Sequence, residues 1–276
     1  MPSRALLPVI WFWLLAICLA GPAAANDLDD VLERGTLRVG TALFSPWAMR
    51  AEDGALIGFE AEVAAKLAQD MGVELETAVM AFDQLIPALE EGAIDMIAAG
   101  LSITPRRALV ISFSQPYATS GINMLVNREL GETLGNLSDF NDPSARIAVV
   151  RDTAASDVAR SLFPEAEIFL LANEEEVATA VLTKRVLAAV ATTPFPELRR
   201  LAQPNRVFVP FEQPLVTTGE GFGLSRGAYD LKAYLDSWIV FRSLDGWLGD
   251  RRDYWFGTLA WQSQLPPEER ITRESQ

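Results

Sequence analysis

Short apolar strands and amphipathic helices alternate along the first part of the chain, and this alternation limits the possible folds more than any other feature. A strand pattern ends at Gly40, and a helix pattern follows in which Phe59, Val63, Leu67 and Met71 recur at a spacing of four. The next segments are typical of strand, helix and strand, over residues 73–79, 83–91 and 94–99. Strands separated by helices at this spacing form βαβ units, so we expect an α/β protein with a parallel sheet.

A second series of the same kind follows a polar break. Residues 122–126 are typical of an extended strand, and polar residues 127–129 end it. Asn173 is a predicted helix N-cap, with Glu174, Glu175 and Glu176 in the first turn, where carboxylates favour the helix dipole. Further strands are predicted over residues 146–150, 168–171 and 186–191. We therefore expect two similar α/β halves with a cleft between them, a common place for a small-molecule site.

The N-terminus has the pattern of a secretory signal over residues 1–25. Arg4 precedes an apolar run over residues 9–20 that is too short to span a bilayer comfortably. A small-residue cleavage site, residues 23–25, leaves Asn26 as the mature N-terminus. A lipoprotein at Cys18 is the competing interpretation, but the preceding Ile17 is not small. The pattern predicts an exported protein, in the periplasm.

The composition excludes several kinds of chemistry. The chain has no histidine, which removes Ser-His-Asp and Cys-His nucleophile sites and imidazole metal sites. Its one cysteine, Cys18, lies in the predicted leader, so we expect no disulfide and no thiolate ligand. The formal net charge of −14 argues against nucleic acid as a partner, because phosphate binding needs a basic face. We expect no metal and no cofactor.

The strand over residues 94–99 ends at a candidate anion site. Gly100 follows the strand, and Ser102, a proline and the pair Arg106-Arg107 follow in a turn that leads into a helix. Ligands of open α/β sheets bind beyond the carboxyl ends of the strands, and a guanidinium held there is suited to two-point capture of a carboxylate. Phe44 lies in the loop after an earlier strand, where it either covers the core or stacks on a ligand. The glycine-rich residues 219–224 lack the lysine of a phosphate loop.

Several motifs in a fixed order resemble the family 3 extracellular solute-binding proteins. These type II periplasmic binding proteins are the polar-amino-acid receptors of ABC importers. The matching segments are residues 35–41 (GTLRVGT), 58–60 (GFE), 85–89 (LIPAL), 102–105 (SITP), 113–117 (FSQPY) and 254–257 (YWFG). The resemblance implies two lobes, each a mainly parallel sheet flanked by helices, with residues 26–126 and 226–276 in lobe 1 and residues 127–225 in lobe 2.

The resemblance also implies roles for residues of the first lobe. Phe44 falls where an aromatic stacks on the ligand, and Phe82 falls beside the pocket. Gly100 and Ser102 fall where backbone and hydroxyl hold the ligand's amine and carboxylate. Arg107 falls on the arginine that grips the α-carboxylate, whereas we interpret Arg106 as a solvated charge.

The second lobe departs from the family pattern. Asp152-Thr153 stands where the family has Gly-Thr, whose amides help to hold the carboxylate. Thr192 stands where the family has the acid that pairs with the ligand's α-ammonium. A hydroxyl is a much weaker partner for a buried ammonium than a carboxylate. Either Asp152 substitutes for the missing acid or the ligand lacks the usual α-ammonium; a third reading makes Asp152 a simple helix cap.

Three functions follow from this pattern. The leading hypothesis is a non-enzymatic, monomeric binding protein that closes on a carboxylate or amino-acid ligand and docks on the membrane permease of an ABC transporter. The second is an enzyme resembling the periplasmic cyclohexadienyl dehydratases, whose catalytic glutamate would fall on Phe195, with Glu197 two residues away. The third is an accessory or sensor subunit of another periplasmic system.

Overall fold

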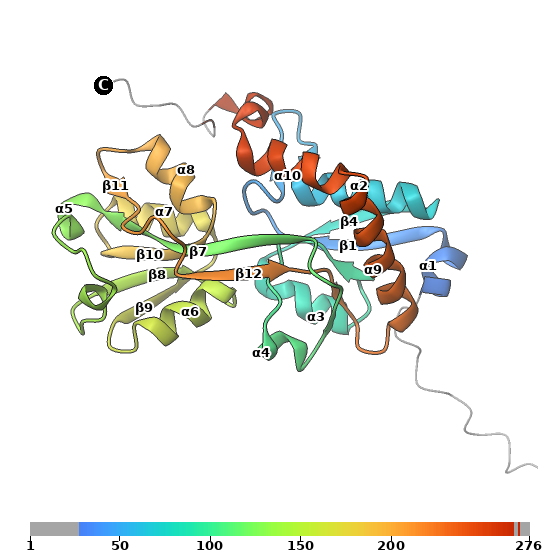
Figure 1. The fold of residues 1–276 in the computed structure, drawn as a ribbon, viewed down its shortest axis with the longest axis horizontal. Coiled ribbons are helices and arrows are strands. Elements are labelled where there is room, and N and C mark those ends of the chain that lie inside the picture. The colour runs from blue at the N-terminus through green and yellow to red at the C-terminus, as the bar shows by residue number, and fades with distance from the viewer. Residues whose placement is uncertain (1–27, 268–269, 271–276) are drawn as a thin grey trace, which may run out of the picture.

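The computed structural model describes residues 28–267 and 270 and shows two α/β halves lying side by side (Figure 1). Each half has one larger β-sheet with helices packed on it. The predicted leader, residues 1–25, lies outside the described residues. The α/β class with two lobes is confirmed, although both sheets are mixed.

The sheet of the first lobe is parallel in its centre and antiparallel at one side. Its strand order is β4 (Glu74–Val79), β1 (Thr36–Thr41), β5 (Met96–Ile97), β13 (Gly223–Leu224) and β6 (Ser112–Phe113). β4, β1 and β5 run parallel, whereas β13 runs antiparallel to β5 and β6. A small hairpin pairs β2 (Met49–Arg50) with β3 (Leu56–Ile57). The helices of this lobe are α1 (Leu28–Arg34), α2 (Phe59–Met71), the 3-10 helix η1 (Phe82–Gln84), α3 (Leu85–Glu90), α4 (Pro105–Ala108), α9 (Tyr229–Leu244), α10 (Trp247–Gly257) and η3 (Ala260–Gln264).

The sheet of the second lobe has the order β11 (Val207–Phe208), β7 (Ala118–Asn127), β10 (Ala188–Thr192), β8 (Arg146–Val150) and β9 (Glu167–Leu171). β10, β8 and β9 run parallel, and β7 is antiparallel to β10. The helices are α5 (Arg128–Gly131), η2 (Leu137–Phe140), α6 (Ala154–Leu162), α7 (Glu174–Leu182) and α8 (Phe195–Ala202). The carboxyl ends of β8 and β10 therefore lead into α6 and α8, which brings the loops after both strands to one edge.

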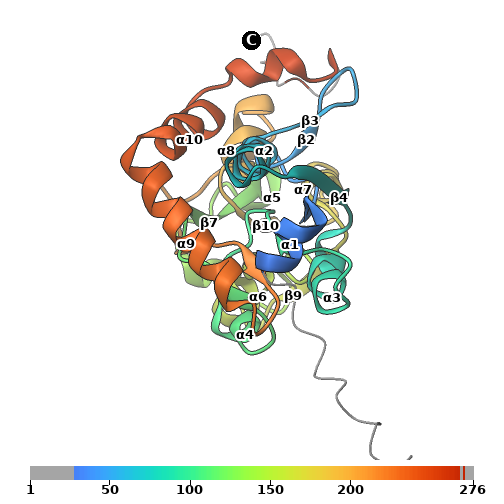
Figure 2. The ribbon, with the colours of Figure 1, turned by 90° about the vertical axis from the view of Figure 1, so that its right-hand side faces the viewer.

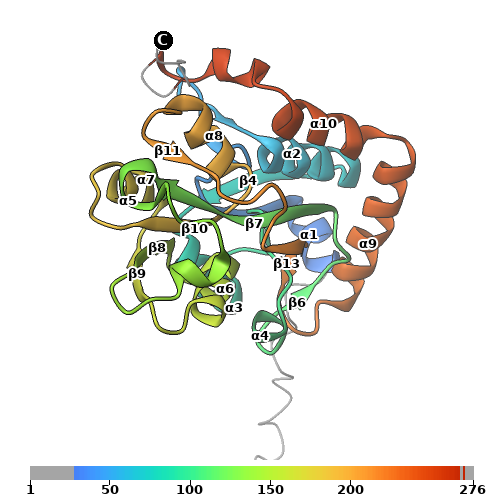
Figure 3. The same ribbon diagram turned by 60° about the vertical axis from the view of Figure 1, so that its left-hand side comes forward.

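Two long antiparallel strands connect the lobes. β7 pairs with β12 (Val216–Glu220) from Ala118↔Glu220 to Ile122↔Val216, and then with β10 through the rest of its length. β7 runs from one half toward the other in Figures 1 and 3, and β12 lies along it in Figure 1. We propose that the lobes pivot on this pair, close to the expected boundaries after residues 126 and 225.

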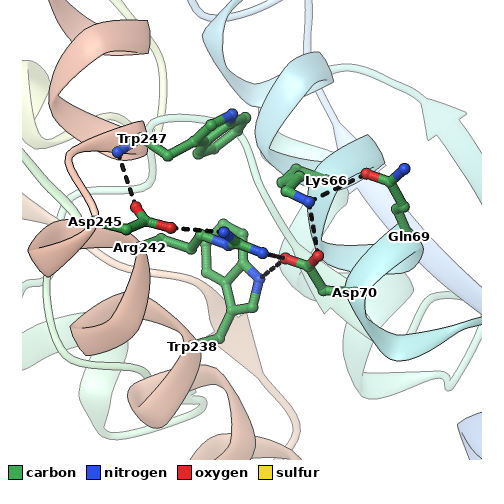
Figure 4. Close-up of polar contacts among 7 residues, drawn as sticks. All are labelled: Lys66, Gln69, Asp70, Trp238, Arg242, Asp245 and Trp247. Atoms are coloured by element: carbon green, nitrogen blue, oxygen red, sulfur yellow. Dashed lines mark hydrogen bonds and ion pairs between the residues drawn. The ribbon is translucent and has the colours of Figure 1, made fainter.

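The C-terminal helices return to the first lobe and close its core. α9 and α10 run along one flank of this lobe, beside α2 (Figure 2). Asp70 of α2 accepts hydrogen bonds from Trp238 Nε1 at 2.8 Å and from Arg242 Nη2 at 2.6 Å (Figure 4). Burial would raise the pKa of Asp70, but its bonds to Lys66, Arg242 and Trp238 lower it. These contacts attach α9 to the first lobe although it follows the second in sequence.

The strand predicted over residues 94–99 is shorter than expected, because only Met96 and Ile97 pair regularly. The preceding Asp95 is fully buried and its carboxylate accepts the Arg38 amide at 2.8 Å. The same carboxylate pairs with the guanidinium groups of Arg34 and Arg38, at 2.5 and 2.6 Å. The Asp95 side chain thus accepts the Arg38 N–H, which regular strand pairing would direct to a backbone carbonyl.

No helix within the described part of the chain has the length and apolarity needed to cross a bilayer.

Candidate functional site

A narrow cleft lies between the lobes and contains several of the predicted residues. Phe44 lines it from the first lobe, and Thr153 and Thr192 line it from the second. The other lining residues are Val150, Ala155, Glu174, Val177, Val190, Ala191 and Phe195. The free space inside is about 10 Å³, enough for about one water molecule. The two lobes are therefore closed on each other in this structure.

Arg107 is placed by a short helix start and bridges the lobes. Thr104 caps α4, its hydroxyl accepting the Arg107 amide at 3.2 Å, and Pro105 occupies the first turn, where its missing N–H costs nothing. The guanidinium donates to the carbonyl of Ser102 in the first lobe and to that of Asp152 in the second, both at 2.8 Å. Arg107 therefore holds the two sides of the cleft together.

The Arg107 side chain is a buried cation with no acid in contact with it. The residue is 8% exposed, and burial lowers its pKa to about 10. Among the described residues it forms no ion pair, whereas the adjacent Arg106 pairs with Asp157, with 3.0 Å between Nη1 and Oδ1. The Phe82 ring lies below the guanidinium, 5.4 Å from centroid to Cζ. A guanidinium desolvated in this way is suited to a carboxylate, because its planar fork matches the two oxygens.

The aromatic wall expected from the sequence is present. The Phe44 and Phe82 rings are 6.5 Å apart at an angle of 41°, and both side chains are half-buried. Phe82 contacts Arg107, whereas Phe44 lines the cleft. The wall thus extends from the cation into the apolar part of the cleft.

Gly100 and Ser102 lie where the central strand ends, above a buried acid. Gly100 has φ +58°, and its N–H donates to Glu60 Oε1 at 2.7 Å. A Cβ at this position would lie 2.8 Å from the Trp47 ring, so both the backbone conformation and the space favour glycine. The Ser102 hydroxyl lies 3.4 Å from that of Thr218 on the connecting strand β12. The site is therefore in direct contact with the strand pair that joins the lobes.

Two buried glutamates lie at this junction. Glu60 Oε1 also accepts the Tyr117 hydroxyl, and Glu220 accepts the hydroxyls of Ser120 at 2.5 Å and Thr218 at 2.9 Å. Burial raises the pKa of each carboxyl to about 7, although these hydrogen bonds oppose the rise. In each group the second oxygen has no partner among the described residues. Both carboxyls therefore titrate near neutral pH.

In the second lobe, Asp152 does not act as the predicted helix cap. Thr153 is the N-cap of α6: its hydroxyl accepts the Ser156 amide at 3.3 Å and donates to the Val150 carbonyl at 2.7 Å. Asp152 has φ 58°, a conformation that glycine adopts easily, and its exposed side chain is not part of the cleft lining. Only its carbonyl reaches the site, through Arg107.

Glu174 is a cleft residue that the sequence did not single out. It begins α7, where Asn173 is the N-cap as predicted, and it lines the cleft. Its Oε1 has no accessible surface and no hydrogen-bond partner among the described residues. Burial raises its pKa to about 8, although Arg199 and the amide of Ser45 from the opposite lobe lower it. Three consecutive glutamates gave no sign of which one faces inward.

These features define a two-lobed α/β protein with a largely apolar cleft between its lobes, a buried glutamate in the cleft lining and a buried arginine that bridges the lobes. The sequence profile of the bacterial extracellular solute-binding proteins, family 3, matches residues 37–258. The chain therefore belongs to this family, as its motifs indicated, and it is related to amino-acid-binding proteins of ABC transporters. The family consists of extracellular solute-binding proteins.

Individual relatives include both binding proteins and enzymes. The chain is 27% identical to the L-cystine-binding protein TcyJ of Escherichia coli K12, over 83% of this chain and 86% of that one. It is 24% identical to cyclohexadienyl dehydratase of Pseudomonas aeruginosa PAO1, over 86% and 91%. Most of the related proteins are thus named as binding proteins, and an enzyme is among them.

Solved structures show the same fold. An ancestral amino acid-binding protein, described as a precursor of cyclohexadienyl dehydratase, superposes with a TM-score of 0.76 at 30% identity, covering 84% of this chain and all of the other. A transporter binding component from Wolinella succinogenes DSM 1740, complexed with lysine, gives 0.77 at 26% identity, covering 83% and 99%.

The positions relevant to dehydratase chemistry are also placed. Phe195 is 3% exposed and lines the cleft. Glu197 lies outside that lining and pairs with Arg200 at 2.9 Å. Glu197, the acid nearest to the position expected for the catalytic glutamate, therefore forms a partly exposed ion pair with Arg200 instead of lining the cleft. Within residues 28–267 and 270, no cluster of acidic side chains has the arrangement needed to hold a metal ion.

Proposed function

We propose that this protein binds an amino acid or a related small carboxylate in the periplasm and delivers it to the permease of an ABC transporter, without catalysis and as a monomer. Its family membership and the lysine and cystine named for its relatives support this function. The eight predicted residues would take part from both lobes: Phe44, Phe82, Gly100, Ser102, Arg107, Asp152, Thr153 and Thr192.

Closure of the lobes is the proposed working step. Several contacts cross between the lobes at the cleft, among them the Arg107 bond to the Asp152 carbonyl, the Arg106–Asp157 pair, and a longer pair between Arg151 and Asp83 at 3.9 Å. The lobes would separate at β7 and β12 to admit the ligand and close again around it. A closed form that buries the ligand can then be distinguished by the permease from the open form.

One observation carries the proposal: Arg107 is a buried cation between the two lobes that forms no ion pair within the described residues. A ligand carboxylate would supply an acidic partner. Breaking such a buried pair costs about 3–5 kcal/mol, which is more than about 100-fold in affinity. Arg107→Ala should therefore abolish the rise in melting temperature that L-amino acids produce in the wild type.

Arg106→Ala is the matched control, because it removes an adjacent arginine whose side chain is 67% exposed. A surface pair of this kind contributes under about 1 kcal/mol, so this variant should bind within about fivefold of the wild type. Binding of carboxylate ligands by Arg107→Ala at wild-type affinity would contradict the assignment of the site.

A dehydratase-like enzyme is the second candidate, and Glu174 is the observation that favours it. With its pKa raised to about 8, this carboxyl is protonated near neutral pH and could give a proton to a departing hydroxyl. Incubation with prephenate and arogenate distinguishes the two functions. Formation of phenylpyruvate or phenylalanine at a rate that Glu174→Gln abolishes would favour the enzyme over the binding protein.

A further inference from the structure

Glu174 lines the cleft, and one of its carboxyl oxygens lacks a hydrogen-bond donor among the described residues. Its Oε1 has neither accessible surface nor a partner among the described residues, and the apolar Val177 and Phe195 line the same space. A polar atom in such a place costs free energy unless a partner reaches it. A ligand that placed a hydrogen-bond donor beside Glu174 Oε1 would therefore remove this cost.

The charged groups around Glu174 are already engaged elsewhere. Arg199 of α8 pairs with Glu175 Oε2 at 2.6 Å and lies over the Phe195 ring, 5.3 Å from its centroid. From the first lobe, the Ser45 amide is the group that acts on Glu174. Glu175 is itself a negative neighbour and raises the pKa of Glu174 further. A cation that entered the cleft would thus meet an acid with spare hydrogen-bonding capacity.

We propose that Glu174 receives the cationic group of the ligand, an ammonium or a guanidinium, and supplies the acid that is missing at Thr192. This inference rests on the proposed binding function and specifies its ligand as a zwitterion or a cation-bearing carboxylate. Thr192 lines the same cleft, so the acid is displaced from β10 to the start of α7 within one site. Asp152, the alternative, has its side chain outside the lining.

A protonation change follows from this arrangement. In the closed cleft without a ligand, burial raises the pKa of the Glu174 carboxyl to about 8, so it holds a proton near neutral pH, whereas a bound cation favours the ionised form. Binding of a cationic ligand to this closed form below about pH 8 should therefore release a proton, and the affinity should rise as the pH approaches that value. A neutral ligand group at this position would produce neither effect.

The test compares Glu174→Gln with Glu176→Gln, a change of the same kind at an exposed glutamate in the same first turn of α7. Four probes separate the possible cations: L-leucine with only an α-ammonium, L-arginine with two cations, 4-guanidinobutyrate with only a side-chain cation, and 4-methyl-2-oxopentanoate with none. Affinities come from titration calorimetry in two buffers of different ionisation enthalpy, which also gives the protons released. The melting temperatures of the free variants show that they are folded.

We expect Glu174→Gln to weaken the cation-bearing probes that bind by about 10- to 100-fold and to remove the proton release, whereas Glu176→Gln should stay close to wild type. An effect on L-leucine identifies the α-ammonium, and one confined to L-arginine and 4-guanidinobutyrate identifies the side chain. Equal affinities in both variants, with binding still dependent on Arg107, would overturn the role of Glu174 alone. If the wild type bound none of the four probes and none of the other proteinogenic L-amino acids, the proposed function would fall with it.

Discussion

The buried glutamate below Gly100 should make the stability of this protein depend on pH in a predictable direction. Glu60 is 1% exposed; Gly100 and Tyr117 bind one of its oxygens, and the other lacks a partner among the described residues. Glu60→Gln keeps an oxygen that can accept both bonds but removes the ionisation. The variant therefore isolates the effect of placing a charge in this site.

The magnitude follows from the shift in pKa. Burial raises the pKa of Glu60 from 4.5 to about 7, so the folded state holds the proton more tightly than the unfolded chain between these values. Stability from this group is complete below 4.5 and is lost as the pH rises through about 7. A shift of about 2.5 units at 1.36 kcal/mol each corresponds to about 3 kcal/mol. The nearby Glu220 contributes to the shift and carries a similar one of its own.

The assay is urea unfolding of the wild type, Glu60→Gln and a control, at several pH values between about 4 and about 8. Glu74→Gln is the control, because that glutamate is exposed on β4. From the low to the high end of this range, Glu60→Gln should lose about 3 kcal/mol less unfolding free energy than the wild type, while the control follows the wild type. Parallel curves for all three proteins would refute the argument that burial keeps Glu60 protonated.

Two further predictions concern the geometry of the site. Gly100→Ala should destabilise the fold by about 1–3 kcal/mol and weaken ligand binding, because the new Cβ would meet the Trp47 ring and the backbone has a φ of +58°. The control is Gly72→Ala, at φ +71° with open space around it, which should lower the unfolding free energy by less in the same denaturation assay. A double-mutant cycle on ligand affinity with Arg106→Ala and Asp157→Ala should give a coupling below about 1 kcal/mol that high salt abolishes, because both side chains are partly exposed. A larger, salt-independent coupling would contradict this.

The sequence allowed a specific proposal for the first-lobe half of the site because its signals are local. A strand, a glycine, a capping threonine and a proline lie within a few residues, so they fix the place of Arg107 without knowledge of the rest of the fold. The loop residue Phe44 was proposed in the same way; in the structure it both packs against the core of the first lobe and lines the cleft. A sequence therefore indicates a functional group best when the position of that group depends on its immediate neighbours in the chain.

The residues that were missed depend on contacts between distant segments. Glu60 and Glu220 come together only when the chain returns through β12 and β13; Glu60 lies in the motif at residues 58–60, but nothing near either glutamate in sequence indicates that they meet. In the sequence, Glu174 is one of three acidic residues at the start of a helix. Only the fold shows that the opposite lobe covers this one. Asp152 looked like a cap because it precedes a helix, but the register of the turn gives that role to Thr153. The strand at residues 94–99 was overestimated because a buried carboxylate replaces part of the ladder.

Two buried ionisable groups between the closed lobes, Arg107 and Glu174, suggest why closure and ligand binding would be coupled. Closing the lobes takes Arg107 out of water, with two carbonyls as its partners, and also covers Glu174. Each desolvation opposes closure, as the lowered pKa of the arginine and the raised pKa of the acid both show. A ligand that carries a carboxylate and a cation would offset both costs at once, whereas a ligand with one of these groups would offset only one. The closed population should therefore respond most strongly to zwitterions, because a ligand shifts this equilibrium only by its differential affinity for the two states.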